Sequence, residues 1–110
     1  MNYLGKLETK HGFFNFCHFD AYIGMALREY GEFSEIELSL MEKFIMKGDV
    51  VLDIGANIGC FTVPFSKKVG NKGNVLAFEP QKFIYELLKK NIDCNEIKNT
   101  TIFNNAVGIN

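Results

Sequence analysis

Apolar residues in the second half of the chain recur first at strand spacing and then at helical spacing, and this order repeats. The apolar run Val50 to Ile54, rich in β-branched residues, predicts a parallel strand covered on both faces. A helix is expected from about Ile58 to Val69, and shorter strands at Val75 to Phe78 and Thr100 to Phe103. Between those two strands, apolar residues recur at helical spacing: Phe83, Ile84, Leu87, Leu88 and Ile92. The order β-α-β-α-β predicts one half of a doubly wound, parallel α/β sheet.

Residues 1–47 follow a different pattern, and we expect them to form an N-terminal extension that leads into a domain over residues 48–110. A hairpin is predicted to turn at His11 and Gly12. Ser34 and Glu37 have the spacing of a capping box at the start of a helix. The apolar face of that helix is predicted to contain Ile36, Leu40, Met41 and Phe44. The aromatic residues near the hairpin are expected to pack on the domain, with a surface for a sugar or a base as the alternative: Phe13, Phe14, Phe16 and Phe19.

The segment after the first apolar strand carries the clearest chemical signal. Gly55 and Gly59 remove Cβ atoms where the chain must turn sharply and where a ligand must come close. Asn57 is expected to cap the following helix. Glu79 ends the next strand, where a carboxylate can accept hydrogen bonds from ribose hydroxyls, and we expect it to have little structural duty. A strand, a glycine turn, a helix and an acidic residue together predict a site for a cofactor that contains a nucleoside.

Two kinds of cofactor suit this layout. The fingerprint for nicotinamide or flavin dinucleotides is G-x-G-x-x-G, and Asn57 occupies the place of its second glycine, which leaves less room for a diphosphate. S-adenosylmethionine has no phosphate, so the turn tolerates it better. A nicotinamide-dependent oxidoreductase is the alternative enzyme. A non-catalytic module that binds a nucleoside or another protein is a third interpretation.

Several linked motifs resemble the FkbM family of S-adenosylmethionine-dependent methyltransferases, and the resemblance covers most of the chain from about Asp20 to Gly108. It implies the Rossmann-like methyltransferase fold, of which this chain would contain the first half. It also implies transfer of a methyl group to an oxygen, such as a hydroxyl on a sugar or another small metabolite. The motifs are Asp20, Ile23-Gly24, Leu27, Tyr30 to Ser34, Asp53 to Gly59, Phe61 to Val63, Val69-Gly70, Phe78 to Gln81, Leu88 with Asn91, and Asn105 to Gly108.

The resemblance also implies a role for individual residues. Asp53 and the turn formed by Gly55, Ala56, Asn57 and Gly59 would line the methionine end of the cofactor. Glu79 would bind the ribose, and the chain from Asn104 to Ala106, which includes Asn105, would lie near the adenine. Tyr30 and Glu32, together with Ser34, would close over the methionine end. No residue is assigned as a catalytic base.

Composition narrows the remaining choices. Twelve basic and thirteen acidic residues leave the chain nearly neutral, so nucleic acid is not an expected partner. Cys17, Cys60 and Cys94 are odd in number and form no C-x-x-C pair, which is typical of reduced thiols in the cytoplasm. Cys60 is expected to pack rather than to act as a nucleophile. His11 and His18 have no neighbouring ligand cluster, so no metal site is predicted, and no apolar run is long enough to span a membrane.

Length limits what this chain is expected to do alone. Its 110 residues include only three of the seven strands that the methyltransferase fold has, which suggests an N-terminal fragment without the acceptor pocket or the general base. The strand Val50 to Ile54 would then have an unpaired, apolar edge, and such edges promote association with another chain. We therefore expect the isolated chain to self-associate or to be loosely packed, and to transfer no methyl groups.

Overall fold

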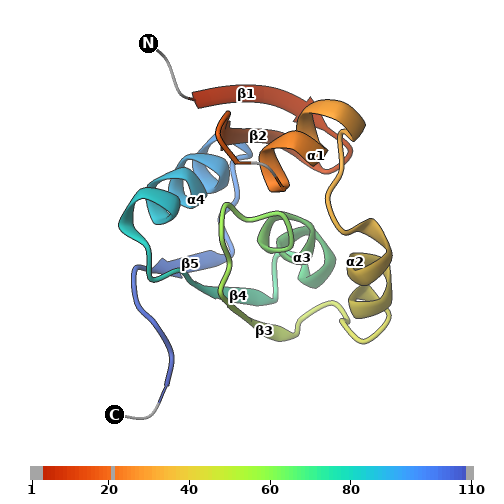
Figure 1. Cartoon of the computed structure of the whole chain (residues 1–110). Helices are drawn as coiled ribbons and strands as arrows, with labels where there is room; N and C mark the ends of the chain where they lie inside the picture. Colours follow the sequence, from red (N-terminus) through yellow and green to blue (C-terminus); the bar gives the residue numbers. More distant parts are fainter. Residues whose placement is uncertain (1–3, 21, 109–110) are drawn as a thin grey trace.

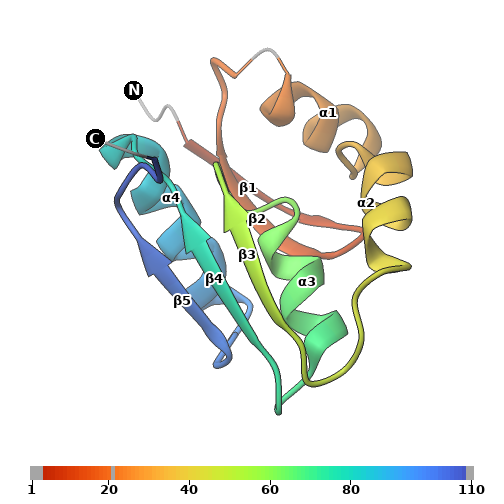
Figure 2. The same ribbon diagram turned by 90° about the horizontal axis from the view of Figure 1, so that it is seen from below.

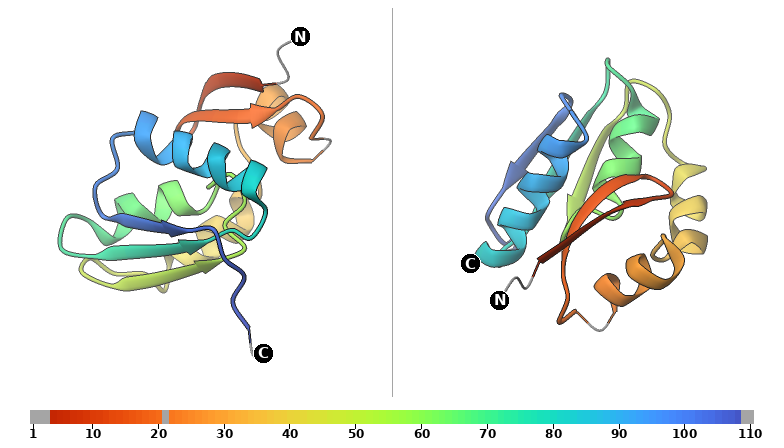
Figure 3. Two further views of the ribbon diagram at one scale, coloured as in Figure 1. Left: turned by 90° about the vertical axis from the view of Figure 1, so that its left-hand side faces the viewer. Right: turned by 90° about the horizontal axis from the view of Figure 1, so that it is seen from above.

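A hairpin, a layer of helices and a parallel sheet are stacked in three layers in the computed structural model (Figures 1 and 3). The structure describes residues 4–20 and 22–108. Strands β1 (Leu4–Thr9) and β2 (Gly12–Cys17) are antiparallel, with Thr9 opposite Gly12, so the predicted hairpin is confirmed. Helices α1 (Ile23–Tyr30) and α2 (Glu35–Glu42) lead from this hairpin to the sheet.

The sheet contains three parallel strands in the order β3-β4-β5. These are β3 (Val50–Ile54), β4 (Asn74–Phe78) and β5 (Thr100–Phe103), and each lies within one residue of its predicted bounds. Helix α3 (Thr62–Val69) connects β3 to β4, and α4 (Lys82–Cys94) connects β4 to β5. Figure 2 shows the three strands side by side with both helices behind them. The predicted β-α-β-α-β order is therefore confirmed.

Helices cover only one face of the sheet. The side chains of Val51 and Asp53 point towards α3, whereas Val50, Leu52 and Ile54 are 60%, 55% and 58% exposed on the opposite face. The prediction that this strand is covered on both faces was wrong for this chain. No described helix or strand lies beneath the sheet in Figure 1, where only the chain after β5 runs downwards. Among the described strands, β3 pairs with β4 alone and so forms an edge.

The buried core links the layers in two clusters. Leu38 of α2 packs with Phe65, Val69 and Val75 in the cluster between α2, α3 and the sheet. The other cluster joins the hairpin, α1 and α4 to the sheet, and its members include Phe14, Phe16, Leu27, Ile58, Ala77, Leu87 and Leu88. Since Phe14 and Phe16 are only 2% exposed, packing explains these aromatic residues, whereas Phe13 and Phe19 are exposed.

Helix α2 differs from its prediction in two respects. Ser34 does precede its first residue, but φ at Ser34 is 52° and its side chain makes no capping hydrogen bond to the described residues. The capping box was therefore wrong, because a capping serine has an extended backbone and Ser34 has a left-handed one. The buried side of the helix is formed by Leu38, with Met41 and Ile45 packed beside it, while the predicted apolar face is mainly exposed: Ile36, Leu40 and Phe44.

Candidate functional site

Residues 55–61 form the glycine turn between β3 and α3. Backbone φ is positive at Gly55 (77°), Asn57 (56°) and Gly59 (100°). An α-helix needs negative φ at every residue, so the helix begins at Thr62 rather than near Ile58. Asn57 is not the predicted helix cap, and its Oδ1 instead accepts a hydrogen bond of 3.0 Å from the N–H of Ile58. Asparagine tolerates this left-handed conformation better than most residues, so it can stand where a fingerprint has glycine.

The carboxylate of Glu79 ties the glycine turn to the end of β4. Its Oε1 accepts a hydrogen bond of 2.9 Å from the N–H of Asn57, and its Oε2 accepts one of 2.9 Å from the N–H of Gln81. The carbonyl of Phe78 accepts two further bonds, of 2.9 Å each, from Gly55 and Ala56. Glu79 is only 5% exposed. The prediction of little structural duty for Glu79 was therefore wrong, although each carboxylate oxygen keeps a second lone pair for a ligand.

Asp53 places a second carboxylate at the carboxyl end of β3. It is 9% exposed, and its Oδ2 accepts a hydrogen bond of 2.6 Å from the Thr62 hydroxyl. Burial raises the pKa of Asp53, and the hydrogen bond from Thr62 opposes this rise only in part. A cationic group brought next to Asp53 would therefore relieve an unfavourable buried charge.

A cavity of about 210 Å³ lies beside Asp53 and the glycine turn. We call it the turn pocket. Its cysteine, Cys60, has its pKa raised to about 12, chiefly by burial, with the charges of Asp20 and Asp53 adding to the effect. A thiol with that pKa is protonated at neutral pH, which supports the packing role over a nucleophile. The residues that line the turn pocket are Ile23, Phe33, Asp53, Gly55, Ala56, Asn57, Cys60 and Phe61.

The structure brings together only some of the residues expected at the site. Asp53, Gly55, Ala56 and Asn57 line the turn pocket, Glu79 holds its turn, and Gly59 lies in that turn next to Leu88. Ile23 and Phe33 complete the wall of the pocket, and neither was assigned a role in advance. Like Glu79 and Gly59, four further predicted site residues lie outside the pocket lining. They are Tyr30 at the end of α1, Glu32 just after it, and Asn105 and Ala106 after β5.

These four residues have other surroundings in the structure. Tyr30 is 74% exposed, and the carboxylate of Glu32 lies 3.8 Å from the ammonium of Lys10. After β5, it is Asn104 that reaches the site, because its side-chain amide donates to the carbonyls of Glu79 and Pro80 at 2.9 and 3.0 Å. The roles of Tyr30, Glu32, Asn105 and Ala106 stay predictions. Asn104 has a short polar side chain in a loop, and the sequence alone gave no sign of its partner.

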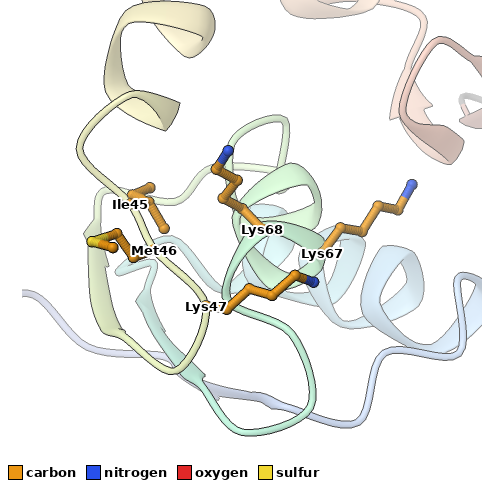
Figure 4. Close-up of a pocket in the computed structure, with 5 residues that line it drawn as sticks. All are labelled: Ile45, Met46, Lys47, Lys67 and Lys68. Carbon is orange, nitrogen blue, oxygen red and sulfur yellow. The ribbon is translucent and has the colours of Figure 1, made fainter.

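A larger hollow, of about 500 Å³, lies at the opposite end of α3 and is lined by Ile45, Met46, Lys47, Lys67 and Lys68. Ligands of open α/β sheets bind at the carboxyl ends of the strands, whereas this hollow adjoins the amino end of β3. Figure 4 shows that the side chains of Lys67 and Lys68 point in different directions. Because these ammonium groups do not converge, the hollow lacks the geometry of an anion site.

Metal ligation and membrane insertion find no support in the described part of the chain. Residues 4–20 and 22–108 contain no group of three or more His, Cys, Asp or Glu side chains placed to hold a metal ion. His11 lies 2.9 Å from the carboxylate of Glu35, which gives it a partner on α2. The longest described helix, α4, has 13 residues, and none of the described helices meets the length and hydropathy of a membrane span.

Comparisons with known proteins agree on one class of enzyme. Residues 53–110 match the family model described as the methyltransferase FkbM domain. A curated relative from Sulfurisphaera tokodaii, named "Probable cobalt-precorrin-6B C(15)-methyltransferase (decarboxylating)", is 37% identical over 65 residues, which are 59% of this chain and 34% of that protein. The matched region thus spans about a third of this curated relative's length.

Solved structures give the same result for the fold. A protein-L-isoaspartate O-methyltransferase is 27% identical with a TM-score of 0.64, and the match covers 68% of this chain and 24% of that chain. A SAM-dependent methyltransferase from Aquifex aeolicus is also 27% identical, with a TM-score of 0.59, and the match covers 66% of this chain and 41% of that chain. The predicted Rossmann-like methyltransferase fold and the family resemblance are both confirmed.

Proposed function

Since this chain belongs to the methyltransferase FkbM family, we propose that its turn pocket is part of the binding site for S-adenosyl-L-methionine in a methyltransferase. The observation that carries the proposal is the position of two buried carboxylates, Asp53 and Glu79, on either side of a turn with three positive φ angles. A cofactor with a cationic amino-acid end and a ribose needs such an arrangement. The choice of cofactor is supported by similar solved structures, such as the SAM-dependent methyltransferase from Aquifex aeolicus.

The residues present fit this cofactor. A Cβ atom added to Gly55 would meet no described heavy atom within 4 Å, so the backbone of the turn is open to a ligand. The cavity of about 210 Å³ is smaller than the roughly 300–1,000 Å³ of typical ligand pockets. It therefore suits one end of the cofactor rather than all of it. Phe33 and Ile23 provide an apolar wall, as most small-molecule sites require.

Each polar group has a task in this proposal. Asp53, held in place by Thr62, pairs with the ammonium group of the methionine end. Glu79 binds ribose hydroxyls with the lone pairs that Asn57 and Gln81 leave unused. The glycine turn allows close approach of the backbone, because Gly55 has no side chain. The predicted roles of Tyr30, Glu32, Asn105 and Ala106 belong to the same proposal.

The chemistry supplied by the bound cofactor is an electrophilic methyl group on a sulfonium. This chain contributes to its transfer mainly by holding the sulfonium in a fixed position, which favours in-line attack by an acceptor. Cys60 does not compete as an acceptor, because its raised pKa keeps the thiol protonated. The acceptor we propose is a hydroxyl on a sugar or small metabolite. The location we propose for this protein is the cytoplasm. We also keep in the proposal the division of the chain into residues 1–47 and 48–110. The proposed acceptor is not a nucleic acid.

Calorimetry with S-adenosylhomocysteine and with NAD tests this function. We expect S-adenosylhomocysteine to bind at least tenfold more tightly than NAD, because the turn has Asn57 in place of a second glycine. As a control, the variant Glu86→Ala removes an exposed carboxylate on α4 and should leave the preference for S-adenosylhomocysteine over NAD unchanged. Tighter binding of NAD would favour the oxidoreductase alternative and overturn the proposal.

A further inference from the structure

Along the outer edge of strand β2, backbone N–H and carbonyl groups form hydrogen bonds with side chains rather than with another strand. Asn91 lies in the last turn of α4, and Asn95, four residues later, caps the C-terminus of that helix. The side-chain amide of Asn95 accepts from the N–H of Phe13 at 2.9 Å and donates to its carbonyl at 2.7 Å. Asn91 accepts from the N–H of Asn15 at 2.6 Å and donates to its carbonyl at 3.1 Å. The two amides therefore occupy the hydrogen-bonding positions of a neighbouring strand.

Asn91, unlike Asn95, also contacts the glycine turn. Its side-chain nitrogen also donates a hydrogen bond of 2.7 Å to the carbonyl of Ile58, in the glycine turn. Its oxygen accepts a second bond, of 2.9 Å, from the side-chain amide of Asn15. Both donors and both acceptor positions of Asn91 are thus used, and the residue is 0% exposed. A buried amide with four partners has one permitted orientation.

The contact with Ile58 falls at the centre of the turn. Ile58 is 1% exposed and lies between Asn57 and Gly59, whose φ angles are 56° and 100°. Glu79 fixes the N–H of Asn57 from the other side of the same turn. The turn is therefore held at two points, one from β4 and one from α4. Figures 1 and 3 show the hairpin above α4, and the Asn91 amide contacts both the hairpin and the turn.

We propose that Asn91 is a positioning residue for the cofactor turn, and that the hairpin β1–β2 acts on the cofactor site through it. Asn15 fixes the orientation of the Asn91 amide, and that orientation directs one N–H at Ile58. Loss of the hairpin contact would leave the amide free to rotate away from the turn. This proposal rests on the proposed function for its effect on affinity, but its structural part concerns the turn alone.

A matched pair of variants tests the proposal in the full chain. Asn91→Ala and Asn95→Ala each remove an amide that docks β2, but only Asn91→Ala also frees the carbonyl of Ile58. We expect Asn91→Ala to weaken binding of S-adenosylhomocysteine by about tenfold or more, the effect of losing a buried hydrogen bond and leaving its acceptor unpaired. Asn95→Ala should weaken it by less than about threefold.

Amide exchange followed by NMR gives a second readout without ligand. The amides of Asn57 and Gly59 should exchange faster in Asn91→Ala and stay close to wild type in Asn95→Ala. Equal effects of the two variants on affinity and on these amides would overturn the proposal and leave Asn91 as a staple for the hairpin. If the wild-type chain binds no S-adenosylhomocysteine, the proposed function fails, while the exchange of the turn amides still decides the role of Asn91.

A measurement on the wild-type chain covers the case in which Asn91→Ala does not fold. Coupling between two sites is reciprocal, so a ligand that orders the turn must also strengthen the contact between Asn91 and Asn15. Saturating S-adenosylhomocysteine should therefore slow exchange of the Asn15 amide more than that of the Phe13 amide, which Asn95 holds. Equal protection of the two amides would contradict the proposal.

Discussion

Replacement of Glu79 by alanine should reduce both the stability of the chain and its affinity for the cofactor. The substitution removes the acceptor of two backbone N–H groups, at Asn57 and Gln81. A hydrogen bond to a charged group contributes about 1.5–3 kcal/mol, so two such bonds would contribute at most about 3–6 kcal/mol. Asn57 and Gln81 are exposed residues whose N–H groups can bind water instead. We therefore expect a net loss of about 1.5–3 kcal/mol in the free energy of unfolding, half of that sum.

The corresponding fall in Tm is roughly 6–12 °C for a domain of this size, measured by calorimetry or circular dichroism. Loss of the ribose contact should weaken binding of S-adenosylhomocysteine by about 10- to 100-fold, or roughly 1.5–3 kcal/mol. Glu86→Ala makes the same change in charge on an exposed surface and should leave both quantities near wild type. An unchanged Tm for Glu79→Ala would show that the two backbone contacts do not hold the turn, and unchanged affinity would remove Glu79 from the ribose site.

Three further experiments test the roles of Asp53, of Cys60 and of the exposed face of the sheet. Because burial places the folded-state pKa of Asp53 above its ordinary value, the stability gained from the protonated form is present in acid and lost as pH rises through that pKa. Asp53→Asn should therefore have a Tm at least equal to that of the wild type at pH 7, and the difference in Tm should vanish in acid. The variant should also bind S-adenosylhomocysteine less tightly. A lower Tm for Asp53→Asn at pH 7 would contradict this reasoning. Cys60, with its pKa raised to about 12, should resist alkylation by iodoacetamide at pH 7.5 until the chain is unfolded, and rapid labelling of the folded chain would contradict the raised pKa. The exposed sheet face should cause concentration-dependent association in sedimentation experiments, which Leu52→Lys should reduce; a wild-type chain that stays monomeric at all concentrations would show that this face does not associate.

Hydrophobic periodicity was sufficient to predict the parallel sheet. The run Val50 to Ile54 has the length and the β-branched residues of a strand, although three of its five side chains are exposed. The helical repeat that includes Leu87 and Leu88 buries those residues on one face of α4. For α2 the same reasoning gave the wrong face. Leu38 and Ile36 lie on apolar stripes of similar strength, and only the position of α3 and Phe65 determines that Leu38 is the buried one.

The glycine turn shows which features of the site a sequence cannot supply. The positions of Gly55 and Gly59 indicated a sharp turn, but they did not show that Asn57 would also have a positive φ and delay the helix to Thr62. The two backbone contacts of Glu79 were equally hidden, because they depend on how close the end of β4 comes to the turn. Phe33 enters the turn pocket from a segment about twenty residues earlier in the chain, and no local pattern encodes such a long-range contact.

Residue-by-residue NMR titration with S-adenosylhomocysteine tests directly whether the turn pocket is the cofactor site. We expect the largest shifts in the backbone amides of Asp53, Gly55, Ala56 and Asn57, which line the turn pocket, together with a shift at Glu79. Residues 45–47, at the lysine-lined hollow in Figure 4, should not respond. Shifts centred on that hollow, or saturation without any change between residues 53 and 57, would contradict the assignment of the cofactor site.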